Sequence, residues 1–487
     1  MSELKVLNKD VVSKTIAKVK IMQFGEGNFL RAFLDQLVQR LNDSGLYSGH
    51  VVVVQPLEVG RIEELKKADG LYTVILQGLD DNKKEVDYHK VIDVLDDFVN
   101  PYKEYERYLA YGESEDLEVV FSNTTEAGIY FEEKDVLTDI DHVTPISYPA
   151  KLLALLKRRY QKFGNKLPLC LCPCELLDDN GDKLKAALLK LAKARNEDEG
   201  FINYLDNVTH YTSNLVDRIV PGFPRENFDE YCQKFGYIDN NMVKGEFFHL
   251  FVIKKEEEVM KRIPLDKVDT NTLFVDDIHP YKQRKVRALN GTHTSMVPVA
   301  YLLGHDEVRE SLLDKQLYSY VEHTLYDEIV PTIKADGAKE FADAVLLRFL
   351  NPFVHHKLMS IALNSLSKFR ERDLPSLLET EEKAPKHLLF SLASLLAFYR
   401  GFRYKNGVKE EIKLADTPDN LAFMKDIYAQ YDSDHDAKAL TVKFLANTSI
   451  WNMDLSTHKV IVDHVASYVS MILENNDYSA VLKKVFD

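Results

Sequence analysis

A strand, a glycine turn and a helix follow one another near the N-terminus, and this unit constrains the fold more than any other stretch. Residues 18–24 have the pattern of a half-buried strand, and Gly25-Glu-Gly27 follows directly. The next residues place apolar side chains on one helical face, at Phe29, Phe33, Leu34, Leu37, Val38 and Leu41. In dinucleotide-binding folds such glycines let a pyrophosphate approach the backbone at a helix N-terminus. The stretch therefore predicts a Rossmann-like α/β domain whose turn residues bind the cofactor, namely Phe24, Gly25, Glu26, Gly27, Asn28 and Phe29.

The end of the second strand, at residues 51–55, decides which dinucleotide is expected. In NAD-binding proteins an acidic residue near this position commonly binds the ribose hydroxyls. Here Gln55 occupies the position, and Glu58 follows three residues later. The nearest arginine is Arg61, so no arginine stands at position 55 to receive a 2′-phosphate. The sequence favours NAD over NADP and places Gln55 in the cofactor site.

A further buried strand, at residues 117–122, ends in polar side chains. Ligands of open α/β sheets bind at the carboxyl ends of the strands, so Ser122, Asn123 and Thr124 are predicted to contact the cofactor. The alternative is an ordinary turn in which Ser and Thr cap a helix. Other elements expected in this half are strands 72–79 and 86–94, as an antiparallel insertion, helix 148–163, strand 167–173 and helix 182–195.

Two features of this half have both a structural and a functional interpretation. Cys170, Cys172 and Cys174 alternate along a strand and so share one face, which favours buried thiols over a tetrahedral zinc site or mutual disulfides. Asp217 and Arg218 interrupt an apolar strand. They are either a buried ion pair, which is the commoner case, or part of a site.

The pattern changes near residue 245. Residues 245–253 form the last obvious strand, and after about residue 283 the chain reads as successive helices. We therefore predict two domains, a dinucleotide-binding domain at 1–245 and a mainly helical substrate domain at 246–487. The helices are expected at 283–303, 305–330, 337–347, 353–369, 385–401, 418–432, 436–446 and 456–474, with loops at 370–386 and 416–420.

The start of the helical half contains an amine, an amide and an imidazole within nine residues, at Lys285, Asn290 and His293. In an α-helix, Asn290 and His293 would share a face, and Lys285 would lie roughly 80° around the axis from His293. All three could point into a single cleft. The alternative is a solvated basic turn.

The acidic net charge of −15 argues against a nucleic-acid or anionic-membrane partner. No apolar run approaches the ~18 residues of a membrane span, and the first residues lack a signal-peptide core. We expect a cytoplasmic protein that acts on a small molecule.

Taken together, these stretches resemble the mannitol dehydrogenase family of polyol-specific long-chain dehydrogenases, over nearly the whole chain. The family's Gly-x-Gly-x-Phe-x-Arg-Ala turn matches residues 25–32, and its signature Lys-x-x-x-x-Asn-x-x-His matches Lys285, Asn290 and His293. Further matches are the Thr-Glu turn in Asn123-Thr-Thr-Glu126, the Val-Asp-Arg-Ile-x-Pro motif at 216–221, and Glu246–Ile253, where Phe251 replaces a tryptophan. Each motif is weak alone, but their order and spacing are specific.

The resemblance implies hydride transfer between NAD(H) and a carbonyl carbon, without zinc. It implies Lys285 as general acid and base, with Asn290 and His293 polarising the carbonyl, and Lys368 as a substrate-contacting lysine. We also expect Asp217 and Lys282 to bind substrate, since a second lysine near the site would suit a substrate carboxylate. A lysine in water titrates near 10, so this role requires burial or neighbouring cations such as Lys282 and Arg284. Neighbouring His355 and His356 lack a spacing typical of zinc ligands.

Within the family, the chain is most similar to the branch that interconverts tagaturonate and altronate. Cys174-Glu175-Leu176 stands where the mannitol branch has Cys-Asp-Asn, and Lys282 and Ser360 replace a glutamate and an arginine of that branch. These changes disfavour a plain polyol. The alternatives are a fructuronate reductase, a mannitol or mannitol-phosphate dehydrogenase, and, more remotely, a non-catalytic NAD-binding protein.

Overall fold

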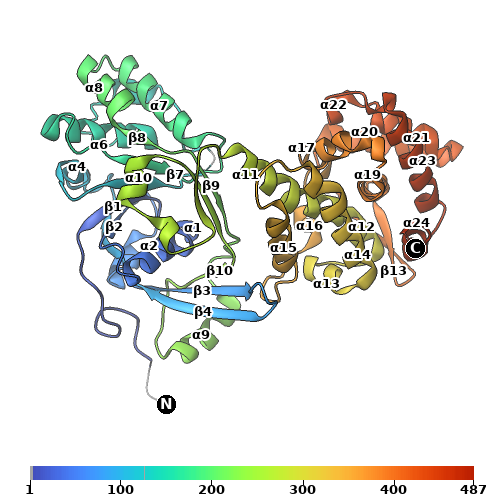
Figure 1. The fold of residues 1–487 in the computed structure, drawn as a ribbon, viewed down its shortest axis with the longest axis horizontal. Coiled ribbons are helices and arrows are strands. Elements are labelled where there is room, and N and C mark those ends of the chain that lie inside the picture. The colour runs from blue at the N-terminus through green and yellow to red at the C-terminus, as the bar shows by residue number, and fades with distance from the viewer. Residues whose placement is uncertain (1–3, 126, 487) are drawn as a thin grey trace. The chain divides into compact units, whose positions relative to one another are not determined.

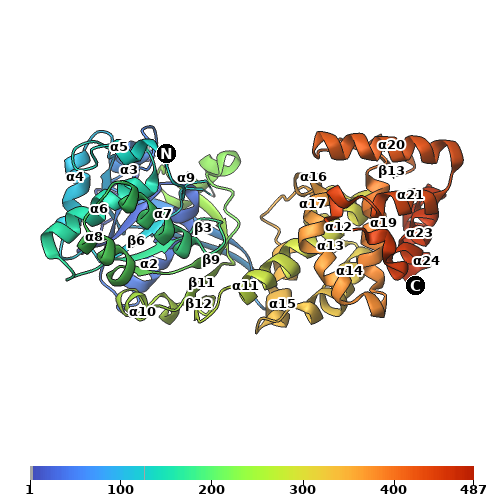
Figure 2. The same ribbon diagram turned by 90° about the horizontal axis from the view of Figure 1, so that it is seen from above.

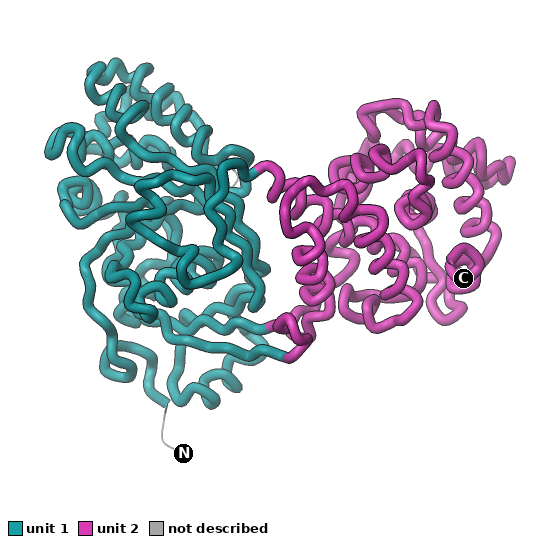
Figure 3. The backbone as a smooth tube through the Cα atoms, viewed as in Figure 1, with its two compact units in different colours: residues 1–77, 85–278 teal, residues 78–84, 279–487 magenta. Residues whose placement is uncertain are grey.

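The computed structural model describes residues 4–125 and 127–486, which form two compact units (Figure 3). Unit 1 comprises residues 1–77 and 85–278, and unit 2 comprises residues 78–84 and 279–487. The units therefore divide the chain at residue 278, whereas the sequence placed the boundary at 245. The reason is that β11 (Leu250–Lys254) pairs with β9 (Asn214–Asp217) and with β12 (Thr272–Val275), which keeps the chain in unit 1.

A six-stranded sheet in the order β5-β2-β1-β6-β7-β8 forms the centre of unit 1 (Figure 1). All of its neighbouring strands are parallel. Its strands are β1 (Val19–Phe24), β2 (His50–Val54), β5 (Leu95–Val99), β6 (Val119–Ser122), β7 (Cys170–Pro173) and β8 (His210–Tyr211). The chain reverses its direction of travel across the sheet between β1 and β6, which is where open α/β sheets bind ligands. The predicted Rossmann-like fold is confirmed.

Both faces of this sheet are buried, because successive apolar side chains in its strands point to opposite faces of the sheet. Ile21, Val53 and Phe121 pack on one face with α2 (Leu34–Asp43), while Met22 and Phe24 pack on the other. The second face is covered by α6 (Tyr148–Phe163) and α7 (Asn180–Ala194). The alternation predicted for the cysteines is confirmed, because Cys170, Cys172 and Cys174 all belong to the first cluster. Burial raises the pKa of Cys172 to about 12.

The helix that follows the glycine turn is broken at Phe33. It consists of α1 (Asn28–Ala32) and α2, and Phe33 between them has φ −118° and ψ −76°. The predicted apolar face is nevertheless buried, since Phe33, Leu37 and Leu41 have no exposed surface. The break leaves the carbonyl oxygen of Ala32 to accept a hydrogen bond from Arg218 at 2.5 Å.

The strand predicted at 245–253 is in fact two strands in different sheets. β10 (Val243–Glu246) pairs with β3 (Tyr72–Leu79), whose other neighbour is β4 (Glu85–Ile92), and β11 begins after a break at residues 247–249. The fully buried Arg218 stabilises this break. It donates to the carbonyl oxygens of Phe248 (3.2 Å) and Phe247 (3.4 Å) and contacts Nδ1 of His249 at 3.0 Å. Arg218 is thus a structural residue, and burial lowers its pKa to about 10.

Unit 2 is mainly helical (Figure 2). The predicted helix 283–303 consists of α11 (His279–Arg284), a π-helical segment η5 (Lys285–Gly291) and α12 (Thr292–Leu303). Its other long helices are α14 (Lys315–His323), α15 (Ala338–Phe349), α17 (Ser365–Arg372), α19 (Lys386–Phe398), α20 (Pro418–Asp434), α21 (Ala437–Leu445), α23 (Lys459–Leu473) and α24 (Tyr478–Phe486).

Several elements of unit 2 differ from the prediction. The helix predicted at 353–369 is divided into α16 (Leu358–Ile361) and α17. The loop expected at 370–386 contains the end of α17 and the whole of α18 (Leu374–Glu379). Helix α24 was not predicted, and neither was the hairpin of β13 (Phe402–Lys405) and β14 (Val408–Glu411). The hairpin turns at Asn406-Gly407, both with positive φ, a pair of residues that favours such turns. Over residues 4–125 and 127–486, no helix is long and apolar enough to cross a membrane.

Candidate active site

The three residues of the predicted catalytic trio lie on the continuous segment formed by α11, η5 and α12. Lys285 begins the π-helical segment, Asn290 lies near its end, and His293 follows in α12. A π-helix bonds residue i to residue i+5. Lys285 and Asn290, five residues apart, therefore lie close to one face, rather than being turned away from each other as α-helical spacing would require. Single π-turns of this kind occur frequently at functional sites.

Asn290 opens onto a cavity of about 560 Å³ within unit 2. The cavity is lined by His279, Lys282, Gln283, Val286, Asn290, Ser367, Lys368, Glu371 and Arg372. It thus brings together three residues that the sequence singled out, namely Lys282, Asn290 and Lys368. Lys285 is half-buried in the π-helical segment that contributes Asn290 to the cavity. Asp217 lies in unit 1, at the end of β9 opposite Leu250.

His293 is buried and neutral. Its ring stacks on Phe349 with centroids 4.0 Å apart, and His356 meets it edge-on at 5.2 Å. Burial lowers its pKa well below the usual value, and the nearby cations, including Arg372 and Lys368, lower it further. Within the described part of the chain, its Nε2 atom has no hydrogen-bond partner. A neutral imidazole with this nitrogen available can form one hydrogen bond with a substrate oxygen.

Arg372 also lines this cavity, and the sequence analysis did not single it out. Its Nη1 donates to Oγ1 of Thr294 at 3.1 Å, and Thr294 donates in turn to the carbonyl oxygen of Asn290 at 2.9 Å. Lys368, one turn earlier on α17, donates to the carbonyl oxygen of Ile361 at 2.7 Å. Lys368 and Arg372 have the i, i+4 spacing that places two side chains on one helical face. The predicted helix ended at residue 369, so the sequence analysis placed Arg372 in a loop and did not pair it with Lys368.

Arg284, one of the cations expected to act on Lys285, is occupied elsewhere. Its guanidinium donates to the carbonyl oxygens of Asp336 (2.6 Å) and Gly337 (3.4 Å) and lies over the rings of Tyr281 and Phe341. It therefore anchors the start of α15.

The glycine turn of unit 1 has the backbone that a dinucleotide site needs. Gly25 has φ +118°, and a Cβ there would lie 3.2 Å from the carbonyl oxygen of Asn123, so the turn requires glycine. Gly25 N–H donates to the carbonyl oxygen of Val54, and Asn123 N–H donates to that of Phe24, which joins the carboxyl ends of β1, β2 and β6. A Cβ at Gly27 would meet nothing within 4 Å, so a ligand can approach the backbone there.

Four side chains of this turn are engaged within the protein. The ring of Phe24 is buried against Tyr148, and Phe29 stacks on Phe33. The Asn28 side chain accepts a hydrogen bond from Arg31 at 2.7 Å. Oε1 of Glu26 accepts a hydrogen bond from Arg61 N–H at 3.3 Å, which ties the turn to the loop after β2. These residues are therefore able to offer a ligand mainly their backbone.

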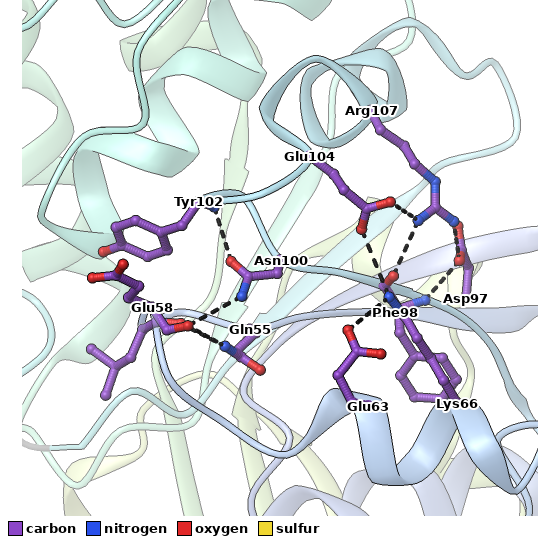
Figure 4. Close-up of polar contacts among 11 residues, drawn as sticks. Gln55, Glu58, Glu63, Lys66, Asp97, Phe98, Asn100, Tyr102, Glu104 and Arg107 are labelled. Carbon is purple, nitrogen blue, oxygen red and sulfur yellow. Dashed lines mark hydrogen bonds and ion pairs between the residues drawn. The ribbon is translucent and has the colours of Figure 1, made fainter.

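The loop after β2 presents Glu58 rather than Gln55 (Figure 4). Nε2 of Gln55 donates to the carbonyl oxygens of Leu57 (2.8 Å) and Glu58 (3.0 Å), and Nδ2 of Asn100 donates to the latter at 3.2 Å. Gln55 is buried and shapes the loop, while Glu58 is exposed. Its carboxylate lies beside Tyr102 in Figure 4. The pKa of the Tyr102 phenol is raised mainly by burial and further by the negative charge of Glu58. Glu58 is thus the acidic group at this strand end.

A buried carboxylate, Glu175, fixes the loop after β6. It accepts hydrogen bonds from Ser122 Oγ (3.1 Å), Thr124 N–H (3.0 Å) and Thr124 Oγ1 (2.9 Å), while Asn123 Nδ2 donates to the carbonyl oxygen of Cys174 (2.8 Å). The sequence marked Glu175 only as a departure from the mannitol branch. Burial raises its pKa, and the hydrogen bonds oppose that rise. Glu126, in the same motif, lies outside the described residues.

Replacing Glu175 with alanine should destabilise unit 1 and loosen this loop. The change leaves the Thr124 N–H and two hydroxyls without their acceptor, and each unsatisfied buried donor costs about 1–3 kcal/mol. We expect the free energy of unfolding in urea to fall by at least ~2 kcal/mol, and dinucleotide affinity to fall with it. Glu175→Gln, which keeps one acceptor oxygen, should lose less. A free energy of unfolding equal to that of the wild type in Glu175→Ala would show that these hydrogen bonds do not stabilise the fold.

Comparisons with known proteins cover nearly the whole chain. The family models for the mannitol dehydrogenase Rossmann domain and the mannitol dehydrogenase C-terminal domain match residues 19–267 and 277–473. The altronate oxidoreductase of Bacillus subtilis (strain 168) is 39% identical over 474 residues, 96% of each chain. That of Escherichia coli O6:K15:H31 is 39% identical over 486 residues, 98% of this chain and 99% of the other.

Two solved structures share the fold. A substrate-free D-sorbitol dehydrogenase superposes with a TM-score of 0.80 at 21% identity, over 98% of this chain and 100% of that chain. Pseudomonas fluorescens mannitol 2-dehydrogenase, in a ternary complex with NAD and D-mannitol, gives 0.64 at 20% identity, over 99% and 97%. The resemblance inferred from the motifs is confirmed by the family matches.

Proposed function

The chain belongs to the mannitol dehydrogenase family of oxidoreductases, and within it we propose that it reversibly reduces D-tagaturonate to D-altronate with NADH. The observation that carries this proposal is the full-length similarity to altronate oxidoreductases at 39% identity. The cavity around Asn290 supports it, because Lys282, Lys368 and Arg372 line it against one carboxylate, Glu371. A substrate acid suits such a lining better than a neutral polyol does.

Unit 1 offers a nicotinamide dinucleotide a suitable cradle. We assign the pyrophosphate to the backbone of Gly25, Glu26 and Gly27, where the positive φ of Gly25 and the open side of Gly27 admit it. Glu58 would accept hydrogen bonds from the adenosine ribose, while Gln55 shapes its loop. Ser122, Asn123 and Thr124 would line the crevice beside the turn. Bound NADH supplies the hydride for the ketone carbon.

The residues of unit 2 would manage the charge and the proton at the ketone oxygen. Lys285 donates a proton from its ammonium group as negative charge develops on that oxygen, and its neutral amine takes the proton back in the oxidation of altronate. Asn290 donates a hydrogen bond from its side-chain amide to the same oxygen. His293 is neutral, so it positions the oxygen through a hydrogen bond rather than protonating it.

The proposed substrate is tested in the oxidative direction by offering NAD with altronate, mannonate, mannitol and mannitol 1-phosphate. We expect kcat/KM to be highest for altronate. A preference for mannonate would indicate a fructuronate reductase, and a preference for either mannitol compound would indicate a polyol enzyme.

Replacing Glu58 with glutamine should weaken the preference for NADH over NADPH. The change removes the charged acceptor for the ribose hydroxyls and the repulsion of a 2′-phosphate. A hydrogen bond to a charged group contributes about 1.5–3 kcal/mol, so we expect the ratio of kcat/KM for NADH and NADPH to fall about 10-fold or more. Glu63→Gln is the matched control, because Glu63 is an exposed glutamate nearby that pairs with Lys66. An unchanged ratio in Glu58→Gln would rule out this role.

A further inference from the structure

We propose that Arg372, together with Lys368, binds the carboxylate of the keto-sugar acid and thereby selects acids over neutral sugars of the same length. This inference rests on the proposed function, and it identifies the side chains that would make the enzyme specific for an acid. It is argued from the cavity at Asn290, from the spacing of the two cations on α17, and from their having no ion pair with a carboxylate in the part of the chain that the structure describes.

The position of Arg372 is fixed relative to the reacting end of the cavity. Arg372 and Lys368 are four residues apart on α17 and both line the cavity that Asn290 enters. The chain of hydrogen bonds from Arg372 Nη1 to Thr294 Oγ1, and from Thr294 to the carbonyl oxygen of Asn290, holds the guanidinium against the turn that carries Asn290. A substrate whose carbonyl oxygen meets Asn290 can therefore extend its chain toward Arg372.

The positive charge of this pair is not compensated by the side chains around it. Among the described residues, the side chain of Arg372 bonds to Thr294 and that of Lys368 bonds to the carbonyl oxygen of Ile361, and neither side chain forms an ion pair. Glu371, the carboxylate of the lining, bonds to Arg370 instead, at 2.8 and 2.9 Å. Two partly buried cations facing a cavity favour an anionic ligand.

The acid next to Arg372 in the sequence does not neutralise it either. Asp373 is fully buried against Gly291, where a Cβ would come within 2.8 Å of its Oδ1. Within residues 4–125 and 127–486, neither of its carboxyl oxygens has a hydrogen-bond partner. Burial raises the pKa of Asp373 well above its ordinary value, which favours the neutral form of this carboxyl group. The charge of Arg372 is thus left for a ligand.

The chemistry of the pair suits a carboxylate. With Nη1 on Thr294, the guanidinium still has Nη2 and Nε to bind two oxygens of a planar acid, and the Lys368 ammonium adds a point charge. The pKa of Lys368 is lowered by burial and then by Arg372, which agrees with the two cations lying close together. A phosphoryl group could use the same cations, so the test includes a phosphorylated ketose.

The test compares Arg372→Met and Arg372→Lys with the wild type on tagaturonate, on tagatose as a neutral ketose, and on fructose 6-phosphate. We expect kcat/KM for tagaturonate to fall on the order of 100-fold in Arg372→Met and less in Arg372→Lys. The value for tagatose should change by less than about threefold, so the ratio between the two substrates collapses. Arg309→Met is the matched control, because Arg309 is a half-buried arginine of the same unit that bonds one carbonyl, that of Leu350.

The outcomes separate this inference from the proposed function. If the wild type does not prefer tagaturonate over tagatose and fructose 6-phosphate, the proposed function fails. If the wild type prefers tagaturonate and Arg372→Met keeps the wild-type ratio, the role of Arg372 is wrong. NADH affinity and thermal unfolding are measured for each variant. If Arg372→Met does not fold, Arg372→Lys and Lys368→Met are compared with the wild type instead. A wild-type ratio of kcat/KM for tagaturonate to that for tagatose in both variants would contradict the inference.

Discussion

Replacing Lys285 with alanine is expected to lower kcat for tagaturonate about 1,000-fold while NADH binds as in the wild type. A positioned general acid contributes about 10²- to 10⁴-fold to a rate. Within the trio, Lys285 is the residue with a transferable ammonium proton, because burial and nearby cations keep the His293 imidazole neutral. Single-turnover oxidation of NADH measures the chemical step, and an NADH titration measures binding.

Two controls separate lost chemistry from lost structure. Lys334→Ala removes an exposed lysine of the same unit and should leave kcat unchanged. Added methylamine should partly restore turnover in Lys285→Ala, since a small amine can occupy the space left by the side chain. A Lys285→Ala variant with wild-type kcat would exclude Lys285 as the acid.

Asn290→Ala should lower kcat about 100- to 1,000-fold with a much smaller change in KM. Removing one preformed donor to a developing oxyanion has an effect of this size. Asn290 lines the cavity, and its backbone carbonyl accepts the hydrogen bond from Thr294, so the substitution leaves that hydrogen bond in place. Steady-state kinetics in both directions, with thermal unfolding as the check on folding, measure the effect.

Asn290→Asp is the informative companion variant. It keeps the size of the side chain but replaces the donor with a carboxylate that repels the developing charge, so its kcat should be no higher than that of Asn290→Ala. A kcat within about twofold of the wild type in Asn290→Ala would mean that the amide does not act on the oxyanion.

The Rossmann half could be predicted because its signals are local and repeated. The two-residue periodicity of strands is visible at 18–24 and in the alternating cysteines, and the structure has strands at both places. The Gly25–Gly27 turn marks where the first strand ends. The exceptions are set by tertiary contacts. Phe33 breaks its helix where Arg218 takes the freed carbonyl, and Arg218 also holds the break that divides residues 245–253 between two sheets.

The motif led to the prediction of the trio Lys285, Asn290 and His293 as catalytic, but it did not predict the backbone geometry of the segment that carries them. No residue pattern predicts the π-helical segment at Lys285–Gly291, and the sequence analysis therefore used α-helical spacing for residues that lie in a π-helix. Arg372 was lost because Arg-Glu-Arg-Asp-Leu-Pro resembles a loop. Pro375 instead lies in the first turn of α18, where proline is well tolerated.

In the loop after β2, the sequence position of a residue did not predict whether its side chain is available to a ligand. Gln55 occupies the expected place at the end of β2, yet its amide is consumed by the carbonyl oxygens of its own loop. Glu58, three residues on, is the group that reaches solvent (Figure 4). Only the folded loop shows which of these two side chains is buried and which is exposed.

The central claim is that this chain reduces the keto-sugar acid tagaturonate, and the direct test offers NADH with tagaturonate, fructuronate, fructose and fructose 6-phosphate in parallel. We predict the highest kcat/KM for tagaturonate, with one altronate formed for each NADH oxidised and none of the epimer at the reacting carbon. Oxidation of NADH by fructuronate or fructose 6-phosphate, with tagaturonate left unchanged, would contradict the claim.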